Sequence, residues 1–179
     1  MQRKPDRMLK AFENIQIFME RGGDVLYMVM AVTFVMWVLI IERLWYFRAI
    51  YGGQVRKVAS AWESRSERKS WYAHKIRTAM ISEIRENLNE GVTLIKTFVA
   101  LCPLIGLLGT VTGMIEVFDV MATTGSGNAR AMAGGVSKAT LPTMAGMVAA
   151  LSGVFMSTYI ERKAKREGEK LEDSLTMDH

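Results

Sequence analysis

The sequence predicts an all-α membrane protein with three transmembrane helices and cytoplasmic helical extensions, assembled as a homo-oligomer. Half of the 179 residues are hydrophobic, and they gather in three long runs that contain no charged residue. Each run approaches the roughly 20 apolar residues that a helix needs to cross a bilayer. Small residues recur at helical spacing in the second and third runs, and such faces pack closely against other helices.

The N-terminal segment, residues 1–24, is predicted to be an amphipathic helix on the periplasmic surface of the membrane. Its apolar side chains fall on one helical face, and its charged side chains lie mostly elsewhere. The apolar residues are Met8, Phe12, Ile15 and Met19, and the charged ones are Lys10, Glu13 and Glu20.

The first transmembrane helix is predicted over residues 25–47. Its core is a run of 17 uncharged residues, Val25 to Ile41, which would be about 26 Å long as a helix. Trp45, Tyr46 and Phe47 follow it and form an aromatic belt of the kind found at membrane surfaces. Gly52 and Gly53 are expected to break the chain after this helix.

A cytoplasmic helical segment is predicted over residues 48–91. The serine-rich, charged stretch from Glu63 to Ser70 indicates a turn. After it, apolar residues recur every four positions, which predicts an amphipathic helix that continues into the second span. These residues are Ile76, Met80, Ile84 and Leu88.

The second and third transmembrane helices are predicted over residues 92–120 and 136–160. Nineteen uncharged residues lie between Lys96 and Glu116, and 22 lie between Lys138 and Glu161. A periplasmic loop, residues 121–135, is expected to join these helices. A cytoplasmic tail, residues 161–179, is expected to extend the last one.

The orientation follows from the basic residues, which favour the cytoplasmic side. Ten Lys and Arg lie between Glu42 and Glu90 and five lie after Ile160, whereas the 122–135 segment contains only Arg130. The sequence therefore predicts a bacterial inner-membrane protein with a periplasmic N-terminus and a cytoplasmic C-terminus, although the first 24 residues also carry five basic groups. The same rule accounts for the net charge of +5 without a nucleic-acid partner.

Two sets of small residues are candidates for helix packing, and a proline in each helix is a candidate kink. The second span contributes Pro103, Gly106, Gly109 and Gly113, and the third contributes Pro142, Gly146, Ala150 and Gly153.

Thr110 and Thr143 are the candidates for an ion pathway. The alternative is that each hydroxyl bonds a carbonyl of its own helix, as intramembrane hydroxyls often do. The middle of each span lacks Asp, Glu and His, so a titratable proton carrier would have to come from a partner.

The two motifs LCPLIGLLGTVTGM and GGVSKATLPTMAGMVAALSGVF, which begin at Leu101 and Gly134, resemble the signature of the MotA/TolQ/ExbB proton-channel family. The three-span layout is similar to that of its ExbB and TolQ members. The resemblance implies a homo-oligomer, a pentamer in this family, whose second and third helices line a pore. An ExbD-like single-span partner would carry the protonatable Asp, and a TonB-like protein would pass the energy to outer-membrane transporters for iron chelates or haem.

The resemblance is uneven along these motifs. Lys138 occupies the position where the family usually has a glutamate, Pro142 replaces a usual alanine, and Glu116 is acidic where a neutral residue is common. The other positions fit the family: Pro103, Gly106, Gly109, Thr110, Gly113 and Thr143.

Glu116 and Lys138 form a candidate charge pair. The second span ends near Glu116 and the third begins near Lys138, so both charges are expected at a similar depth near the periplasmic mouth. The alternative is that Lys138 only anchors a helix end, because lysine can extend its ammonium to the membrane surface.

Within the family, an ExbB-like subunit of a TonB system is favoured, and a TolQ-like subunit for envelope integrity is the alternative. A non-conducting scaffold would use the same glycine faces. An enzyme is not expected, because the segment Thr123 to Gly135 lacks the phosphate-loop pattern. Cys102 is the single cysteine and His74 and His179 form no cluster, so we expect no metal site and no cofactor, with membrane lipids as the surroundings.

Overall fold

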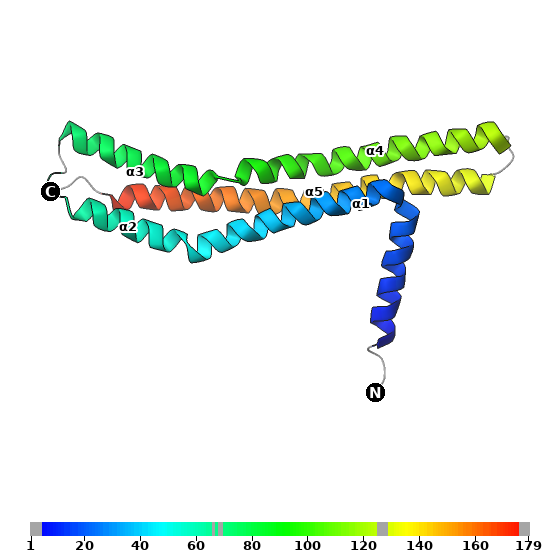
Figure 1. The fold of residues 1–179 in the computed structure, drawn as a ribbon, viewed down its shortest axis with the longest axis horizontal. Coiled ribbons are helices and arrows are strands. Elements are labelled where there is room, and N and C mark those ends of the chain that lie inside the picture. Colours follow the sequence, from blue (N-terminus) through cyan, green and yellow to red (C-terminus); the bar gives the residue numbers. More distant parts are fainter. Residues whose placement is uncertain (1–4, 66, 68–69, 125–128, 176–179) are drawn as a thin grey trace. The chain divides into compact units, whose positions relative to one another are not determined.

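The computed structural model describes residues 5–65, 67, 70–124 and 129–175, and these residues form helices and short connections without a strand. The helices are α1 (Pro5–Ala49), α2 (Tyr51–Glu63), α3 (Trp71–Asn89), α4 (Val92–Thr124) and α5 (Ala129–Ser174) (Figure 1). Three helical stretches in the described residues are long and apolar enough to cross a membrane. The predicted all-α fold with three spans is confirmed.

The chain divides into two compact units. The first unit contains Met1–Val35 and Phe98–Ser152, and the second contains Met36–Thr97 and Gly153–His179. Each unit therefore includes parts of α1, α4 and α5, whereas α2 and α3 belong wholly to the second.

In the first unit, glycines bring the backbones of α4 and α5 together. A Cβ atom on Gly106 would lie 2.8 Å from the carbonyl oxygen of Pro142, and one on Gly113 would lie 2.5 Å from Cβ of Ala139. A Cβ atom on Gly146 would lie 2.5 Å from the carbonyl oxygen of Cys102. Side chains at these positions would push the helices apart, which is why small residues are needed here.

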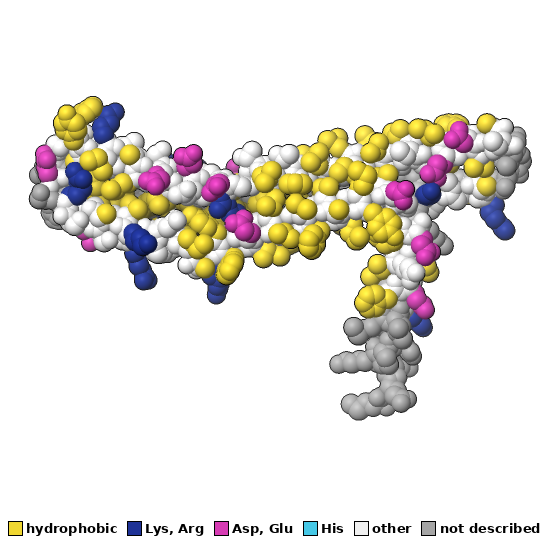
Figure 2. Space-filling model, viewed as in Figure 1, with side chains coloured by type: hydrophobic (Ala, Val, Ile, Leu, Met, Phe, Trp, Pro, Cys, Tyr) yellow, Lys and Arg dark blue, Asp and Glu magenta, His cyan; other side chains and the backbone are white. Residues whose placement is uncertain are grey.

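The outward-facing surface of the same α4 segment is apolar. Its side chains are more than a third exposed in the single chain, and Figure 2 shows hydrophobic atoms along this helix. Leu104, Leu107, Leu108, Val111, Ile115 and Phe118 form this surface. Such a face suits lipid tails or neighbouring subunits rather than water.

Helix α1 bends at Gly23, where φ is 64° and ψ is −167°. Figure 1 shows the preceding part of α1 turning away at this point. Beyond the bend Leu26 and Val29 are buried, whereas Phe12 and Ile15 before it are exposed. The predicted N-terminal helix is thus present with an uncovered apolar face, although the side chain of Met8 lies outside the described residues.

The second unit has a core of large side chains contributed by every helix. Ser70 begins α3 by accepting a hydrogen bond from the backbone N–H of Ala73, a common N-cap arrangement. Ile84 and Leu88 are buried as the four-residue spacing predicts. The fully buried side chains include Met36, Ile40, Trp62, Leu88, Ile95, Ile160, Leu171 and Leu175.

Polar contacts fix the C-terminal part of α5 in the second unit. Arg77 of α3 donates to the carbonyl oxygens of Leu175 and Glu172 at 2.7 and 2.8 Å. The hydroxyl of Tyr51 donates to the carbonyl of Glu167 at 2.9 Å. Burial, followed by the negative charge of Glu167, raises the pKa of Tyr51 to about 12, so this phenol stays protonated and remains a donor.

The expected break at Gly52–Gly53 is wrong. The interruption falls at Ile50, and both glycines lie inside α2. A mid-helix glycine costs about 1 kcal/mol, but burial of Tyr51 and Trp62 on α2 favours helix over the whole segment.

Two other boundaries also differ from expectation. Helix α3 does not continue into the span, because Gly91 adopts a φ of 74° between α3 and α4, a conformation that glycine adopts readily. Helices α4 and α5 extend into the predicted 121–135 loop as far as Thr124 and Ala129. The extension of the third helix into the tail agrees with expectation, because α5 continues to Ser174.

Candidate functional site between α1, α4 and α5

A chain of hydroxyl groups crosses between α4 and α5 in the first unit. The hydroxyl of Thr143 donates to the carbonyl oxygen of Gly106 at 2.7 Å, and it also contacts the hydroxyl of Thr110. A hydroxyl has only one proton to donate, so Thr110 must be the donor to Thr143. We call Thr110, Thr143 and the Gly106 carbonyl the polar seam.

The polar seam leaves one oxygen able to accept a further hydrogen bond. Thr110 Oγ1 donates its proton to Thr143 but keeps its acceptor lone pairs. Both threonines are half-buried in the single chain, so a water molecule or a protonated carboxyl group could approach them. An acceptor of this kind within an apolar span can hold a proton donor in a fixed orientation.

Other hydroxyls of the same helices bond to their own backbone. Thr112 donates to the carbonyls of Leu108 and Gly109, at 3.1 Å in each case. Thr140 donates to Ser137 at 3.1 Å, and Ser152 donates to Ala149 at 2.7 Å. The interhelical bond of Thr143 therefore distinguishes it from these hydroxyls.

Lys138 of α5 and Glu116 of α4 form an ion pair. Lys138 Nζ donates to Glu116 Oε2 at 2.7 Å, and the two side chains are 40% and 56% exposed. An ion pair this exposed is worth only about 0.2–1 kcal/mol. The pair therefore adds little to the stability of the fold, and its main effect is to place two opposite charges at this end of α4 and α5.

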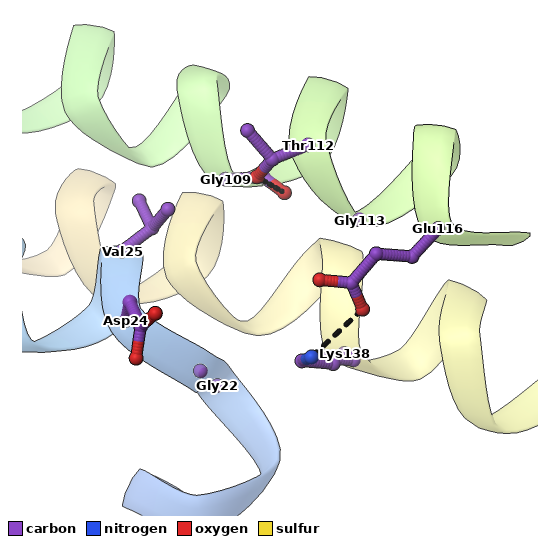
Figure 3. A pocket seen from close by; sticks show the side chains of 9 residues that line it. Gly22, Asp24, Val25, Gly109, Thr112, Gly113, Glu116 and Lys138 are labelled. Atoms are coloured by element: carbon purple, nitrogen blue, oxygen red, sulfur yellow. Dashed lines mark hydrogen bonds and ion pairs between the residues drawn. The ribbon is translucent and has the colours of Figure 1, made fainter.

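A pocket of about 290 Å³ opens beside this ion pair. Three helices contribute to it, and Figure 3 shows Asp24 on α1 and Glu116 on α4 among the residues that line it. We call it the charged pocket; it is lined by Gly22, Gly23, Asp24, Val25, Gly109, Thr112, Gly113, Glu116 and Lys138.

The two prolines lie inside continuous helices. Helix α4 runs through Pro103 and α5 runs through Pro142. Pro142 is fully buried. Its Cβ would lie 2.6 Å from a Cβ atom built on Gly109, so these two residues are in close contact. Because proline has no N–H, the carbonyl of Lys138 also lacks its usual helical donor.

The remaining small residues of the predicted packing set are also buried. Ala150 is 9% exposed and Gly153 is buried. They follow Gly146 along α5, on the face whose small residues were expected to pack against other helices.

Sequence reasoning missed three charged features: Asp24, the ion pair of Lys96 and Glu161, and Arg43. Asp24 was not singled out, although the preceding Gly22–Gly23 dipeptide could have signalled the bend that places it at the charged pocket. Lys96 and Glu161 form an ion pair at 2.8 Å in the second unit. Lys96 precedes the second uncharged run and Glu161 follows the third. Both charges would therefore be expected at a similar depth in the membrane, as Glu116 and Lys138 were, and could have been predicted to pair.

Arg43 was the third omission. It is 4% exposed in the second unit, and its Nε and Nη2 atoms lack a hydrogen-bond partner. Its nearest carboxylate is that of Glu90 at 3.9 Å, and its guanidinium lies 5.0 Å from the ring centre of Tyr46. The sequence places Arg43 beside the aromatic belt, but nothing in that position predicts burial.

These features define a class of protein. Three long apolar helices, with a hydroxyl chain and an ion pair between two of them, make a membrane protein whose α4–α5 interface is polar within an apolar span. Polar groups placed this way commonly mark ion pathways.

The chain belongs to the MotA/TolQ/ExbB proton channel family, whose features match residues 51–173. It is 38% identical over 96 residues to the biopolymer transport protein exbB1 of Vibrio cholerae, which covers 53% of this chain and 42% of that protein. It is 36% identical over 75 residues to the biopolymer transport protein ExbB of Xanthomonas campestris, covering 42% and 30% of the two chains.

A third relative is the ExbB protein of Pseudomonas putida, which is 30% identical over 83 residues, covering 46% of this chain and 25% of that protein. The matched segments thus span less than half the length of these relatives. No solved structure shows significant similarity to the chain.

Proposed function

We propose that this chain is an ExbB-like subunit of an inner-membrane complex that converts the proton motive force into work on outer-membrane transport. Membership of a proton channel family and similarity to biopolymer transport proteins support this proposal. The N-terminus lies in the periplasm and the C-terminus in the cytoplasm, as the distribution of basic residues favours.

In this proposal the chain assembles as a homo-oligomer, a pentamer in keeping with the family resemblance. Helices α4 and α5 line a central path, and an ExbD-like partner contributes a single helix with a protonatable Asp. The described spans themselves hold no mid-membrane acid, so the partner supplies the proton carrier. A TonB-like protein then delivers the energy to transporters for iron chelates or haem.

The polar seam is the observation that carries the proposal. The Thr143 hydroxyl bonds the backbone of a neighbouring helix rather than its own. As a result, Thr110 Oγ1 is free to accept from the protonated carboxyl group of the partner. The ion pair of Glu116 and Lys138 then lies at the periplasmic end of the path, where it takes the place of the family's usual glutamate.

Proton flux tests this function directly. The chain and an ExbD-like partner are reconstituted in liposomes, and a pH-sensitive dye reports acidification under an imposed potential. We expect flux with the intact partner and its loss when the partner's Asp is replaced by Asn. Flux that is absent in both preparations, from a correctly assembled complex, would favour a non-conducting scaffold.

A TolQ-like role in envelope integrity is the alternative within the same family. Both roles use the same channel chemistry, and the neighbouring genes separate them. ExbD-like and TonB-like products support the ExbB role, whereas a Pal-like lipoprotein and a periplasmic propeller support the TolQ role.

A further inference from the structure

Lys138 contacts both of the other helices in the first unit. Its Nζ bonds Glu116 of α4. Toward α1, a Cβ atom on Gly23 would lie 3.0 Å from Lys138 Cε and 3.7 Å from Nζ. The aliphatic part of the Lys138 side chain thus packs against the backbone at the α1 bend. The bend requires a positive φ at Gly23, which glycine adopts readily.

Carboxylates of two helices line the pockets that Lys138 also lines. Asp24 lines the charged pocket together with Glu116 and Lys138. Glu20 lines a second pocket together with Ser137 and Lys138. Among the described residues Lys138 pairs with Glu116, whereas Asp24 and Glu20, on either side of the Gly22–Gly23 bend, are exposed and line the pockets beside it.

We propose that Lys138 exchanges partners, pairing with Glu116 while that carboxylate is charged and moving to Asp24 and Glu20 once Glu116 binds a proton or a sodium ion. The cation adds to a carboxylate oxygen of Glu116, and Lys138 keeps its own proton. One ion pair breaks, another forms, and the cluster loses one net negative charge. The inference rests on the proposed function only in naming the transported ion as the trigger.

The energetics favour such an exchange. Both members of the Glu116–Lys138 pair are substantially exposed, and a pair of that kind shifts an equilibrium by about fivefold or less. Neutralising Glu116 removes this preference, while Asp24 and Glu20 continue to attract the ammonium group. Because Lys138 packs on Gly23, its movement changes the contact that holds the α1 bend.

The exchange predicts that the N-terminal part of α1 reports the state of Glu116. Spin labels on Asn14→Cys and Val136→Cys, both exposed positions, are introduced with Cys102→Ala. The labelled protein is placed in nanodiscs with excess unlabelled chain, so that the measured distance lies within one subunit. We expect Glu116→Gln at neutral pH to shift the distance distribution by several ångströms.

Separate titrations identify the cation. A pH series at constant sodium and a sodium series at constant pH show which ion drives the shift. Combining Asp24→Asn with Glu20→Gln should abolish it. If Glu116→Gln does not assemble, the wild-type pH and sodium series decide.

Two results would overturn the exchange: a distribution unchanged by Glu116→Gln and by both titrations, or a shift that persists in Lys138→Met. Neither readout depends on ion flux. A failed exchange therefore leaves the proposed channel function intact, and a failure of flux leaves the exchange to be judged on these distances.

Discussion

At the scale of single residues, the α4–α5 interface separates two roles that look alike in the sequence. Thr112 and Thr143 are both intramembrane hydroxyls, yet one bonds its own helix and the other bonds the neighbouring helix. The difference arises because Gly106 has no side chain, which lets α5 approach until Thr143 Oγ1 reaches the Gly106 carbonyl at 2.7 Å. A glycine thus creates the polar seam as much as the threonines do.

The Glu116–Lys138 pair gives the first prediction. Lys138→Glu should impair function by placing two carboxylates together, and adding Glu116→Lys or Glu116→Gln should restore part of it. Stability should change by no more than about 1 kcal/mol in any of these variants, because the pair is exposed. A double-mutant cycle measures both uptake and assembly.

The control for this cycle is Lys96→Glu combined with Glu161→Lys, which reverses an ion pair of similar length in the second unit. If the effects of the substitutions at Glu116 and Lys138 simply add, the two residues do not interact in the functional protein. Lys138 would then serve only as a membrane anchor.

At the scale of helices, glycine contacts set the spacing of α4 and α5 and give the second prediction. Gly113→Ala should destabilise the protein by about 1–3 kcal/mol, because its new Cβ would overlap Ala139, which cannot move without shifting α5. Thermal unfolding in detergent measures the loss. Gly53→Ala is the matched control, since nothing lies within 4 Å of its Cβ position, and equal destabilisation by both variants would refute the packing account.

The third prediction concerns the end of α5. Arg77→Met removes two hydrogen bonds to carbonyls of Glu172 and Leu175, and should cost about 1–3 kcal/mol. Hydrogen exchange in the last turns of α5 should accelerate. Lys75→Met removes an exposed positive charge from the same helix and should leave that exchange rate unchanged. If exchange accelerates in both variants, loss of surface charge explains it and the hydrogen bonds of Arg77 do not.

The helices themselves were largely predictable, and their ends were not. Long uncharged runs and a four-residue apolar period depend on local sequence, so they indicated the spans and α3. The Gly52–Gly53 error arose because burial of Tyr51 and Trp62 outweighs glycine propensity. The contribution of Asp24 to the charged pocket depends on the bend at Gly23, a tertiary feature that no periodic pattern reveals.

At the scale of the whole molecule, the fourth prediction is the topology. Ser60→Cys and Ser174→Cys should resist an impermeant thiol reagent in intact spheroplasts, whereas a cysteine at Asn14 or at Ser126 should react. Ser126 lies outside the described residues and tests the connection between α4 and α5. Labelling of Ser60→Cys without lysis would reverse the proposed orientation.

The central claim is that the polar seam belongs to the ion path, and proton flux through Thr143→Val tests it most directly. Valine has nearly the same shape, so the oligomer should assemble. Flux with the ExbD-like partner should nevertheless fall about tenfold, since one positioned hydrogen bond contributes roughly 1.4 kcal/mol. Thr140→Val, whose hydroxyl bonds only its own helix, should conduct as the wild type does. Wild-type flux in Thr143→Val would contradict the account and leave the seam a packing contact.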